Sequence, residues 1–292
     1  MKHPYLGIVV VCGACAALSA CGSSKSPAAP AAPTSTGISV TFPAGGTIYI
    51  GATAQLQVTE TLSDGTTKPV TAAWSSDAPA VATVSQTGIV APVAAGEATI
   101  SADANARRGT LRIRVYPNFN GTWVGAETMI SCDDSGVFDN LCADPAFYTA
   151  GETFRHDSRH TQTDAAATTT VDLGGGMTAS GAATVSIPGE LQLPTTRVRP
   201  EDPDIKVDVE NLRFRSDVPS RLTGNYGIRF SSPNIDGSVL IGLRLDNVAR
   251  TSSTSATAAE RYSLSNARGS FIQKVAMAKR ASSAAIAEPS RK

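Results

Sequence analysis

Apolar and polar residues alternate along most of the chain in short segments, which is the spacing of half-buried β-strands. Within residues 37–117 we count about seven such segments, among them Ile38–Phe42 and Leu111–Val115, with turn residues between them. Asp64-Gly65 stands between two segments and predicts a hairpin. Short strands at this density are typical of a β-sandwich.

Residues 118–279 show the same alternation over longer segments. Apolar residues occupy even positions in Leu222–Phe230 and odd positions in Val239–Leu245, which predicts a hairpin. The phase slips by one residue near Glu210-Asn211, which indicates a β-bulge. One-sided alternation over several strands favours a meander curled around its apolar face. The predicted fold class is therefore all-β, with an N-terminal sandwich and a second antiparallel meander or barrel-like domain.

The two ends of the chain have different compositions. Residues 21–36 are rich in Ser, Pro and Ala and predict a disordered linker. Residues 270–287 fit either a strand or a helix, and we favour a strand ending near Met277. Residues 280–292 are expected to be a disordered basic tail. Formal net charge is zero over the 292 residues, but residues 250–292 carry eight Lys or Arg against two acids. Such a tail is either a solvated end or a contact for anionic lipid or polysaccharide.

The first 20 residues have the pattern of an export signal. Lys2 precedes an apolar run, Tyr5–Ala17, which is short for a membrane span. Leu18-Ser19-Ala20-Cys21 resembles the lipobox of bacterial lipoproteins, in which the cysteine is lipidated and becomes the mature N-terminus. This resemblance implies an exported protein anchored by lipid on Cys21, and Gly22 after it favours the outer membrane or cell surface. The alternative is an ordinary cleaved signal with a cysteine nearby by chance.

Cysteine usage agrees with export. Cys12 and Cys15 leave with the signal, so Cys132 and Cys142 are the remaining pair. In an oxidising compartment this pair predicts a disulfide. The alternative is two free thiols that act as metal ligands.

Residues 37–117 also carry a specific motif. Trp74–Asp77, Val81–Ser85, Gly88 and Gly96–Ile100 follow one another at the spacing of the group 2 bacterial immunoglobulin-like (Big2) domain, which this segment resembles. The resemblance implies an Ig-like sandwich of the kind found in surface proteins and adhesins, often as a stalk. No cysteine lies in the segment, so we expect Trp74 to fill the centre of the core by packing alone.

The second domain opens with Phe119–Gly125, which resembles the G-x-W start of lipocalin-like barrels. The resemblance implies a barrel with Trp123 in the core at its closed end. The alternative is an aromatic residue that caps the first strand of any small sandwich.

Several patterns suggest chemistry but lack the context for it. His156 and His160 stand at the spacing of a zinc-protease motif, yet Thr-rich flanks favour a strand on which they lie roughly 13 Å apart. We expect this strand to be polar and exposed.

Two further patterns also lack a supporting context. Gly174–Ala179 matches the letters of a nucleotide-binding pattern, but its position between two β segments predicts a hairpin tip. Four aspartates surround the cysteine pair without the spacing of an EF-hand: Asp133, Asp134, Asp139 and Asp144. We therefore predict no catalytic residue, no metal site and no cofactor.

The function expected from the sequence is non-catalytic: a lipid-anchored envelope or surface protein in which an Ig-like stalk presents a β domain for adhesion or binding. The membrane, through the N-terminal lipid, is the expected partner, together with a surface polysaccharide or protein. Nucleic acid is not expected. The alternatives are a lipocalin-like carrier of a small apolar ligand and an envelope enzyme of unknown class.

Overall fold

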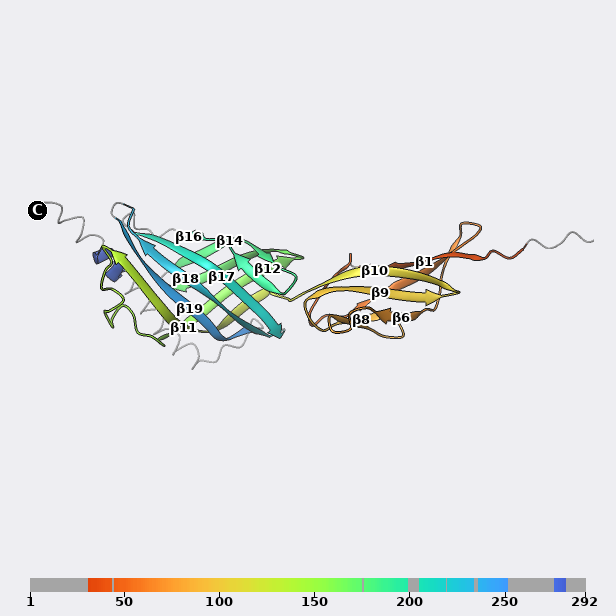
Figure 1. Ribbon diagram of the computed structural model, residues 1–292, viewed down its shortest axis with the longest axis horizontal. Coiled ribbons are helices and arrows are strands. Elements are labelled where there is room, and N and C mark those ends of the chain that lie inside the picture. Colours follow the sequence, from red (N-terminus) through yellow and green to blue (C-terminus); the bar gives the residue numbers. More distant parts are fainter. Residues whose placement is uncertain are drawn as a thin grey trace, which may run out of the picture.

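A computed structural model describes residues 31–43, 45–174, 176–198, 205–218, 220–233, 236–251 and 276–281. The protein is all-β, with an Ig-like N-terminal domain followed by an antiparallel barrel, and the two lie end to end (Figure 1). The predicted signal (1–20), Cys21 and most of the predicted linker and tail lie outside the described residues. Among the described residues, no helix combines the length and apolarity needed to cross a membrane.

The Ig-like domain contains ten short strands. They are β1 (Ser35–Thr41), β2 (Thr47–Tyr49), β3 (Ala54–Gln55), β4 (Gln57–Leu62), β5 (Thr67–Pro69), β6 (Ala73–Ser76), β7 (Ala82–Val84), β8 (Ile89–Pro92), β9 (Gly96–Ala104) and β10 (Arg107–Tyr116). They form three sheets, in the orders β1-β4-β5, β2-β10-β9-β6 and β3-β8-β7. The predicted hairpin at Asp64-Gly65 is confirmed, because β4 pairs antiparallel with β5 and Gly65 takes a φ of 83° that favours glycine.

Small and medium aliphatic side chains make up the core of this domain. Ile100, Ile113 and Val115 are fully buried between the sheets. Trp74 is only half-buried, since it lies on β6 at the edge of its sheet. The expectation that it fills the centre was therefore wrong. Its indole lies instead against Gly88, where an added Cβ would stand 2.9 Å from Cζ2.

The second domain contains nine strands. They are β11 (Gly121–Gly136), β12 (Thr153–Thr163), β13 (Ala166–Gly174), β14 (Met177–Val185), β15 (Glu190–Leu193), β16 (Thr196–Val198), β17 (Lys206–Val218), β18 (Arg221–Ser231) and β19 (Gly237–Thr251). Except for β15 and β16, strands that follow each other in sequence are paired in the sheet, and β19 pairs back with β11. β15 pairs with both β14 and β17, so the sheet closes into an eight-stranded up-and-down barrel to which β16 adds on β17.

Two predicted features of the barrel are confirmed. The hairpin between Leu222–Phe230 and Val239–Leu245 is the β18–β19 pair. The bulge near Glu210-Asn211 appears as a register shift between Glu210 and Arg213. Asn211 takes a φ of 54° there, so the extra residue is accommodated in the left-handed region.

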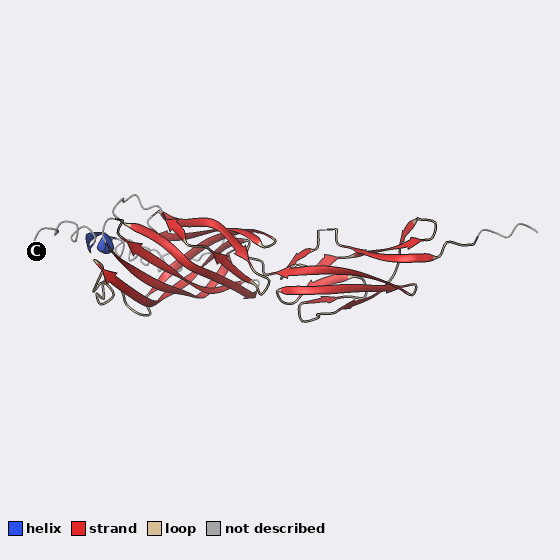
Figure 2. Ribbon diagram, turned by 45° about the horizontal axis from the view of Figure 1, so that its top comes forward, coloured by secondary structure: helices blue, strands red, loops and turns tan. Residues whose placement is uncertain are grey.

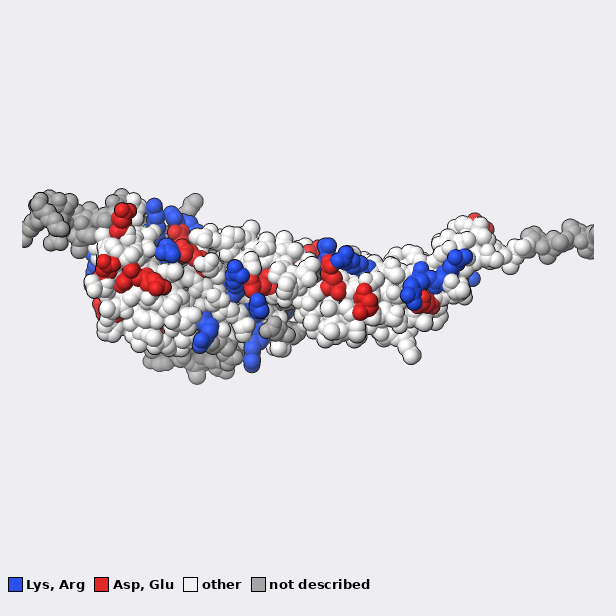
Figure 3. Space-filling model, in the orientation of Figure 1, with Lys and Arg blue, Asp and Glu red and all other residues white. Residues whose placement is uncertain are grey.

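The barrel is apolar inside and charged outside. Its inward side chains form one core with Trp123, Phe214 and Phe230 fully buried. On the outer surface, Glu190 accepts hydrogen bonds from Arg213 and Arg215. Figure 3 shows acidic and basic groups side by side over both domains. Because exposed pairs contribute little to stability, the inward packing determines the fold.

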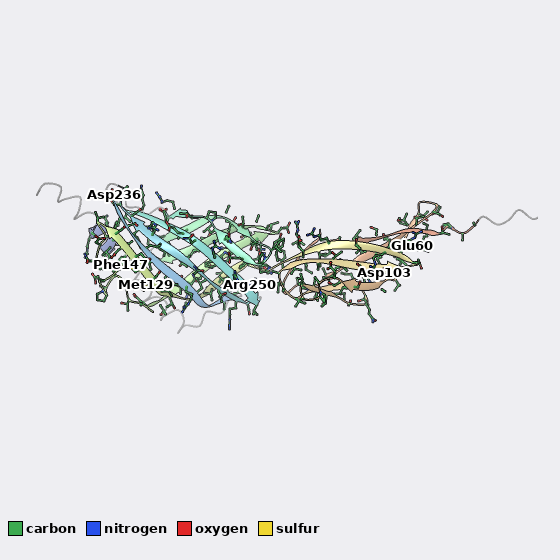
Figure 4. The ribbon with its side chains drawn as sticks, viewed as in Figure 1. Glu60, Asp103, Met129, Phe147, Asp236 and Arg250 are labelled. Atoms are coloured by element: carbon green, nitrogen blue, oxygen red, sulfur yellow. A yellow bond between two sulfur atoms is a disulfide. The ribbon has the colours of Figure 1, made fainter. Side chains whose placement is uncertain are left out.

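The barrel end that faces away from the Ig-like domain carries a long excursion between β11 and β12. The predicted disulfide between Cys132 and Cys142 is present in it. Phe138 and Phe147 of this excursion are fully buried, and Phe147 packs edge-to-face on Phe230. Figure 4 shows Phe147 at this end of the barrel. Residues 276–281 form a short helix at the same end (Figure 2), so the expected strand near Met277 was wrong. Ala278 of this helix is fully buried against the barrel core.

Candidate functional site in the barrel interior

The most unusual chemistry of the molecule lies on the inner face of β12. Phe154, His156, Ser158, His160 and Gln162 alternate with exposed or half-exposed neighbours, so all five point into the barrel. His156 is 0% exposed and His160 is 2% exposed. The expectation of an exposed polar strand was therefore wrong. The two histidines do share one face of a strand, as predicted.

These side chains form one continuous chain of hydrogen bonds. Ser158 lies between the two rings, with its Oγ 2.9 Å from His156 Nε2 and 3.1 Å from His160 Nε2. The other ring nitrogens reach neighbouring strands: His156 Nδ1 is 2.9 Å from Glu127 Oε2, and His160 Nδ1 is 3.1 Å from Thr169 Oγ1. The rings lean toward Ser158 from both sides and so lie closer together than their backbone spacing predicts.

The carboxylate of Glu127 stands at one end of this chain. A carboxylate only accepts, so His156 donates to it from Nδ1. The Ser158 hydroxyl donates to one of the two Nε2 atoms beside it and accepts from the other. Tyr226 donates to the same Glu127 oxygen at 2.6 Å. Every polar group of the chain thus has a partner, which is the condition for burying such groups without loss of stability.

Aromatic rings surround the polar chain. Phe214 packs edge-on against His156, His160 and Tyr226, with centroid separations of 5.6, 5.8 and 6.2 Å. Burial, and next the charge of His156, lower the pKa of His160 to about 3. Burial, and next Glu127, raise the pKa of Tyr226 well above its usual range. Around neutral pH, His160 is therefore uncharged and Tyr226 keeps its proton.

The order Glu127–His156–Ser158 is that of an acid, a base and a nucleophile. A nucleophile must also reach a substrate, and Ser158 is 3% exposed with an imidazole on each side of its hydroxyl. The geometry fits a structural network that fixes the packing of the barrel interior. Within the described ranges, no three His, Cys, Asp or Glu side chains gather as metal ligands.

The network contains residues that the sequence did not single out: Glu127, Ser158, Thr169 and Tyr226. A signal for the inward orientation was present, since Phe154 stands in phase with both histidines on β12. The partners on β11, β13 and β18 depend on strand pairing across the barrel and have no local signature.

The barrel end that faces the Ig-like domain is closed by side chains around Trp123. Trp123 is fully buried and donates from Nε1 to the Phe119 carbonyl at 2.7 Å. Arg250, labelled in Figure 4, lies over its ring, 4.8 Å from the centroid. The Arg250 guanidinium also donates to the Asn118 carbonyl. Gln162 accepts from the Phe119 backbone at 2.9 Å.

The other candidate motifs have structural roles. Asp134 accepts from the Cys142 backbone at 2.7 Å, and Asp144 accepts from the Ala146 backbone at 2.8 Å. These carboxylates therefore cap turns of the excursion between β11 and β12, one inside and one just after the disulfide loop, while Asp133 and Asp139 lie in the same region. Gly174–Ala179 contains the turn between β13 and β14, in agreement with the predicted hairpin tip.

Comparison with known proteins identifies the first domain. Residues 36–115 match the family model of the bacterial Ig-like domain (group 2). No curated protein matches the chain. Among solved structures, the crystal structure of the S-layer protein rSbsC(31-844) is similar with 12% identity and a TM-score of 0.27, over 76% of this chain and 38% of that one. A bacterial Ig-like domain is compatible with an extracellular or surface location. Residues 36–115 thus form a group 2 bacterial Ig-like domain.

Proposed function

We propose that the chain is a lipid-anchored envelope protein without catalytic activity, in which the Ig-like domain holds the barrel away from the membrane. The observation that supports this proposal is the end-to-end arrangement. The first described residues, which follow the proposed lipid site Cys21 in the sequence by ten positions, lie at the end of the Ig-like domain farthest from the barrel (Figure 1). The disulfide-bonded excursion lies at the opposite end of the molecule and is the surface presented for adhesion or binding.

The contacts between the two domains are close enough to keep them in a fixed orientation, as a spacer requires. The Tyr49 hydroxyl, from the Ig-like domain, accepts a hydrogen bond from the Asp164 backbone at 2.9 Å. A Cβ added to Gly189, in the β14–β15 turn, would stand 3.1 Å from Ala95 Cβ and 3.5 Å from Pro117 Cγ. Close packing and a short connection restrict bending between the domains. The barrel is therefore held away from the membrane by about the length of the Ig-like domain.

Metabolic labelling with a radioactive fatty acid tests the anchor. We expect incorporation into the wild-type chain and into Cys15→Ala, but not into Cys21→Ala, which should leave the membrane fraction. Cys15 is the matched control because it lies in the proposed signal. Membrane retention of Cys21→Ala would overturn the anchoring.

A fluorophosphonate probe tests the absence of catalysis. Because Ser158 is buried between two imidazoles, we expect no labelling of the folded protein. Labelling of the wild type that is lost in Ser158→Ala, with the fold intact by circular dichroism, would show a reactive serine and overturn the non-catalytic proposal.

A second candidate function, a lipocalin-like carrier, is favoured by one observation: a closed up-and-down barrel that begins with Trp123 at its closed end. The polar network at mid-barrel and the buried phenylalanines of the excursion argue against an apolar ligand in the barrel interior.

Titration with a fluorescent fatty acid distinguishes the carrier function from the presentation function. The presentation account predicts no saturable binding, and one-to-one binding at micromolar concentration would favour the carrier.

A further inference from the structure

A cleft opens in the Ig-like domain where its sheets part beside Trp74. It has a volume of about 560 Å³ and lies between β4, the connection from β5 to β6, and the β7–β8 turn. Its lining residues are Leu56, Gln57, Val58, Thr59, Pro69, Val70, Thr71, Ala72, Trp74, Gln86 and Thr87. We call this the Trp74 cleft. Its volume lies in the range of small-molecule sites.

The walls of the Trp74 cleft are held in place by the domain itself. The indole rests on Gly88, whose φ of 81° and missing Cβ allow the approach. Gln55 donates from its amide to the Leu56 carbonyl at 2.9 Å and to the Thr87 carbonyl at 2.8 Å. These bonds join the end of β3 to the β7–β8 turn, so the cleft exists before any ligand arrives.

The lining combines an aromatic surface with neutral polar groups. Not one of its side chains is charged. Gln57, Thr71 and Gln86 are exposed, and Thr59 is half-buried. Across the described part of the chain, these four side chains have no hydrogen-bond partner in the protein, so their amides and hydroxyls are available to a ligand.

This combination selects one class of ligand. An ionised ligand would lose hydration in the cleft without gaining a counter-charge, which excludes strongly acidic or basic molecules. A purely apolar ligand would leave the amides and hydroxyls unpaired. A sugar ring has an apolar face to stack on the indole and hydroxyls that both donate and accept. We infer that the Trp74 cleft binds a neutral oligosaccharide.

The inference goes beyond the proposed function, because it gives the spacer domain a ligand of its own. It does not depend on the lipid, so the two proposals fail independently. The full chain carrying Cys21→Ser is the protein to test, since it remains soluble if only the lipid is lost.

The test is a neutral-glycan array followed by calorimetric titration with the best hit, beside maltohexaose, cellohexaose and chitohexaose. We expect saturable binding and a change in Trp74 fluorescence, since the other tryptophan, Trp123, is buried in the barrel. Gln57→Ala/Gln86→Ala should weaken binding about tenfold or more, in line with the loss of two hydrogen bonds. Thr110→Ala, an exposed change on β10 outside the cleft, is the matched control and should bind as the wild type does.

Three results would overturn the inference. One is the absence of binding to any neutral glycan on the array. Another is binding that survives both the glutamine double variant and Trp74→Phe while thermal melting shows an intact fold. The third is preferential binding of an acidic oligosaccharide or an extended peptide, because neither fits an uncharged cleft with an aromatic wall.

Discussion

The Ig-like domain and the barrel bury different kinds of side chain. In the Ig-like domain the core is aliphatic, and its one tryptophan, Trp74, stays half-buried at a sheet edge. In the barrel, Trp123 and several phenylalanines are fully buried around a chain of polar groups that includes two histidines. A sandwich of short strands can be specified by local motifs and small side chains. A closed barrel encloses a larger interior, which needs large side chains and, here, a satisfied polar network.

The largest effect should come from Trp123, with Trp74 as the comparison. Replacing Trp123 by Ala removes a fully buried ring and should lower the free energy of unfolding by about 3–5 kcal/mol. Replacing Trp74 by Ala should cost about half as much, because its ring is half-buried. Urea titrations of the full chain, followed by circular dichroism, measure both losses. If Trp74→Ala lowered the free energy of unfolding as much as Trp123→Ala or more, the contrast between the two cores would be contradicted.

The disulfide should have the next largest effect, confined to the barrel. Cys132 and Cys142 close a loop with a sequence separation of 10. The loop-entropy model gives about 2–3 kcal/mol for a loop of this size. The double variant Cys132→Ala/Cys142→Ala should therefore unfold its barrel at lower urea, while the transition of the Ig-like domain stays unchanged. An equal shift of both domains would show that they unfold as one unit.

Buried His160 should make the barrel lose stability at a higher pH than the Ig-like domain, in which hydrogen bonds lower the pKa of Glu60, Asp77 and Glu97. The pKa of His160 is 6.5 in a model peptide and about 3 in the fold. Between these values the unfolded chain holds one more proton, so the free energy of unfolding decreases as pH falls, by about 1.4 kcal/mol per pH unit. Above pH 6.5 this contribution is fully present.

Comparison with His160→Gln isolates this contribution from that of the carboxylates. Glutamine keeps one donor and one acceptor but does not titrate. The difference in stability between wild type and variant should shrink steadily from pH 6.5 to pH 4. A pH-independent difference would mean that His160 is accessible to protons in the folded barrel.

The smallest effect should come from the domain junction. Tyr49→Phe removes the hydroxyl that accepts from the Asp164 backbone. The interaction between the two domains should weaken by about 0.5–1.5 kcal/mol, because this is one hydrogen bond at an exposed backbone group. Small-angle scattering should show a broader distribution of lengths for the variant, with the melting of each domain unchanged. An unaltered scattering profile would assign the rigidity to Gly189 and Pro117 instead.

Local patterns were sufficient for much of the fold. The β18–β19 hairpin, the bulge at Asn211 and the disulfide depend on alternation, phase and cysteine spacing, all of which can be read within one segment. The Ig-like domain could also be identified, because Trp74 and Gly88 belong to one motif and contact each other in the structure.

The candidate site could be predicted only in part. The sequence places both histidines on one strand face, but that face was assigned to solvent because polar residues are usually exposed. Its burial depends on Glu127, Thr169 and Tyr226, which come from three other strands and satisfy the rings. Trp74 was assigned to the centre of the core because the Ig-like segment has no cysteine to join its sheets, so packing of a large side chain was expected there instead. Both errors reflect packing between distant segments, which residue type alone does not encode.

The central claim is that the Ig-like domain separates the barrel from the membrane, and one measurement tests it directly. Fluorophores attached through an azide-bearing residue at Asp64 or at Asn140 would be compared by energy transfer to a lipid dye, in the lipidated protein reconstituted in vesicles. Asp64 lies in the β4–β5 turn beside the N-terminal entry to β1, and Asn140 lies in the disulfide-bonded excursion. The account predicts strong transfer from position 64 and weak transfer from position 140. Equal transfer from both positions would contradict it.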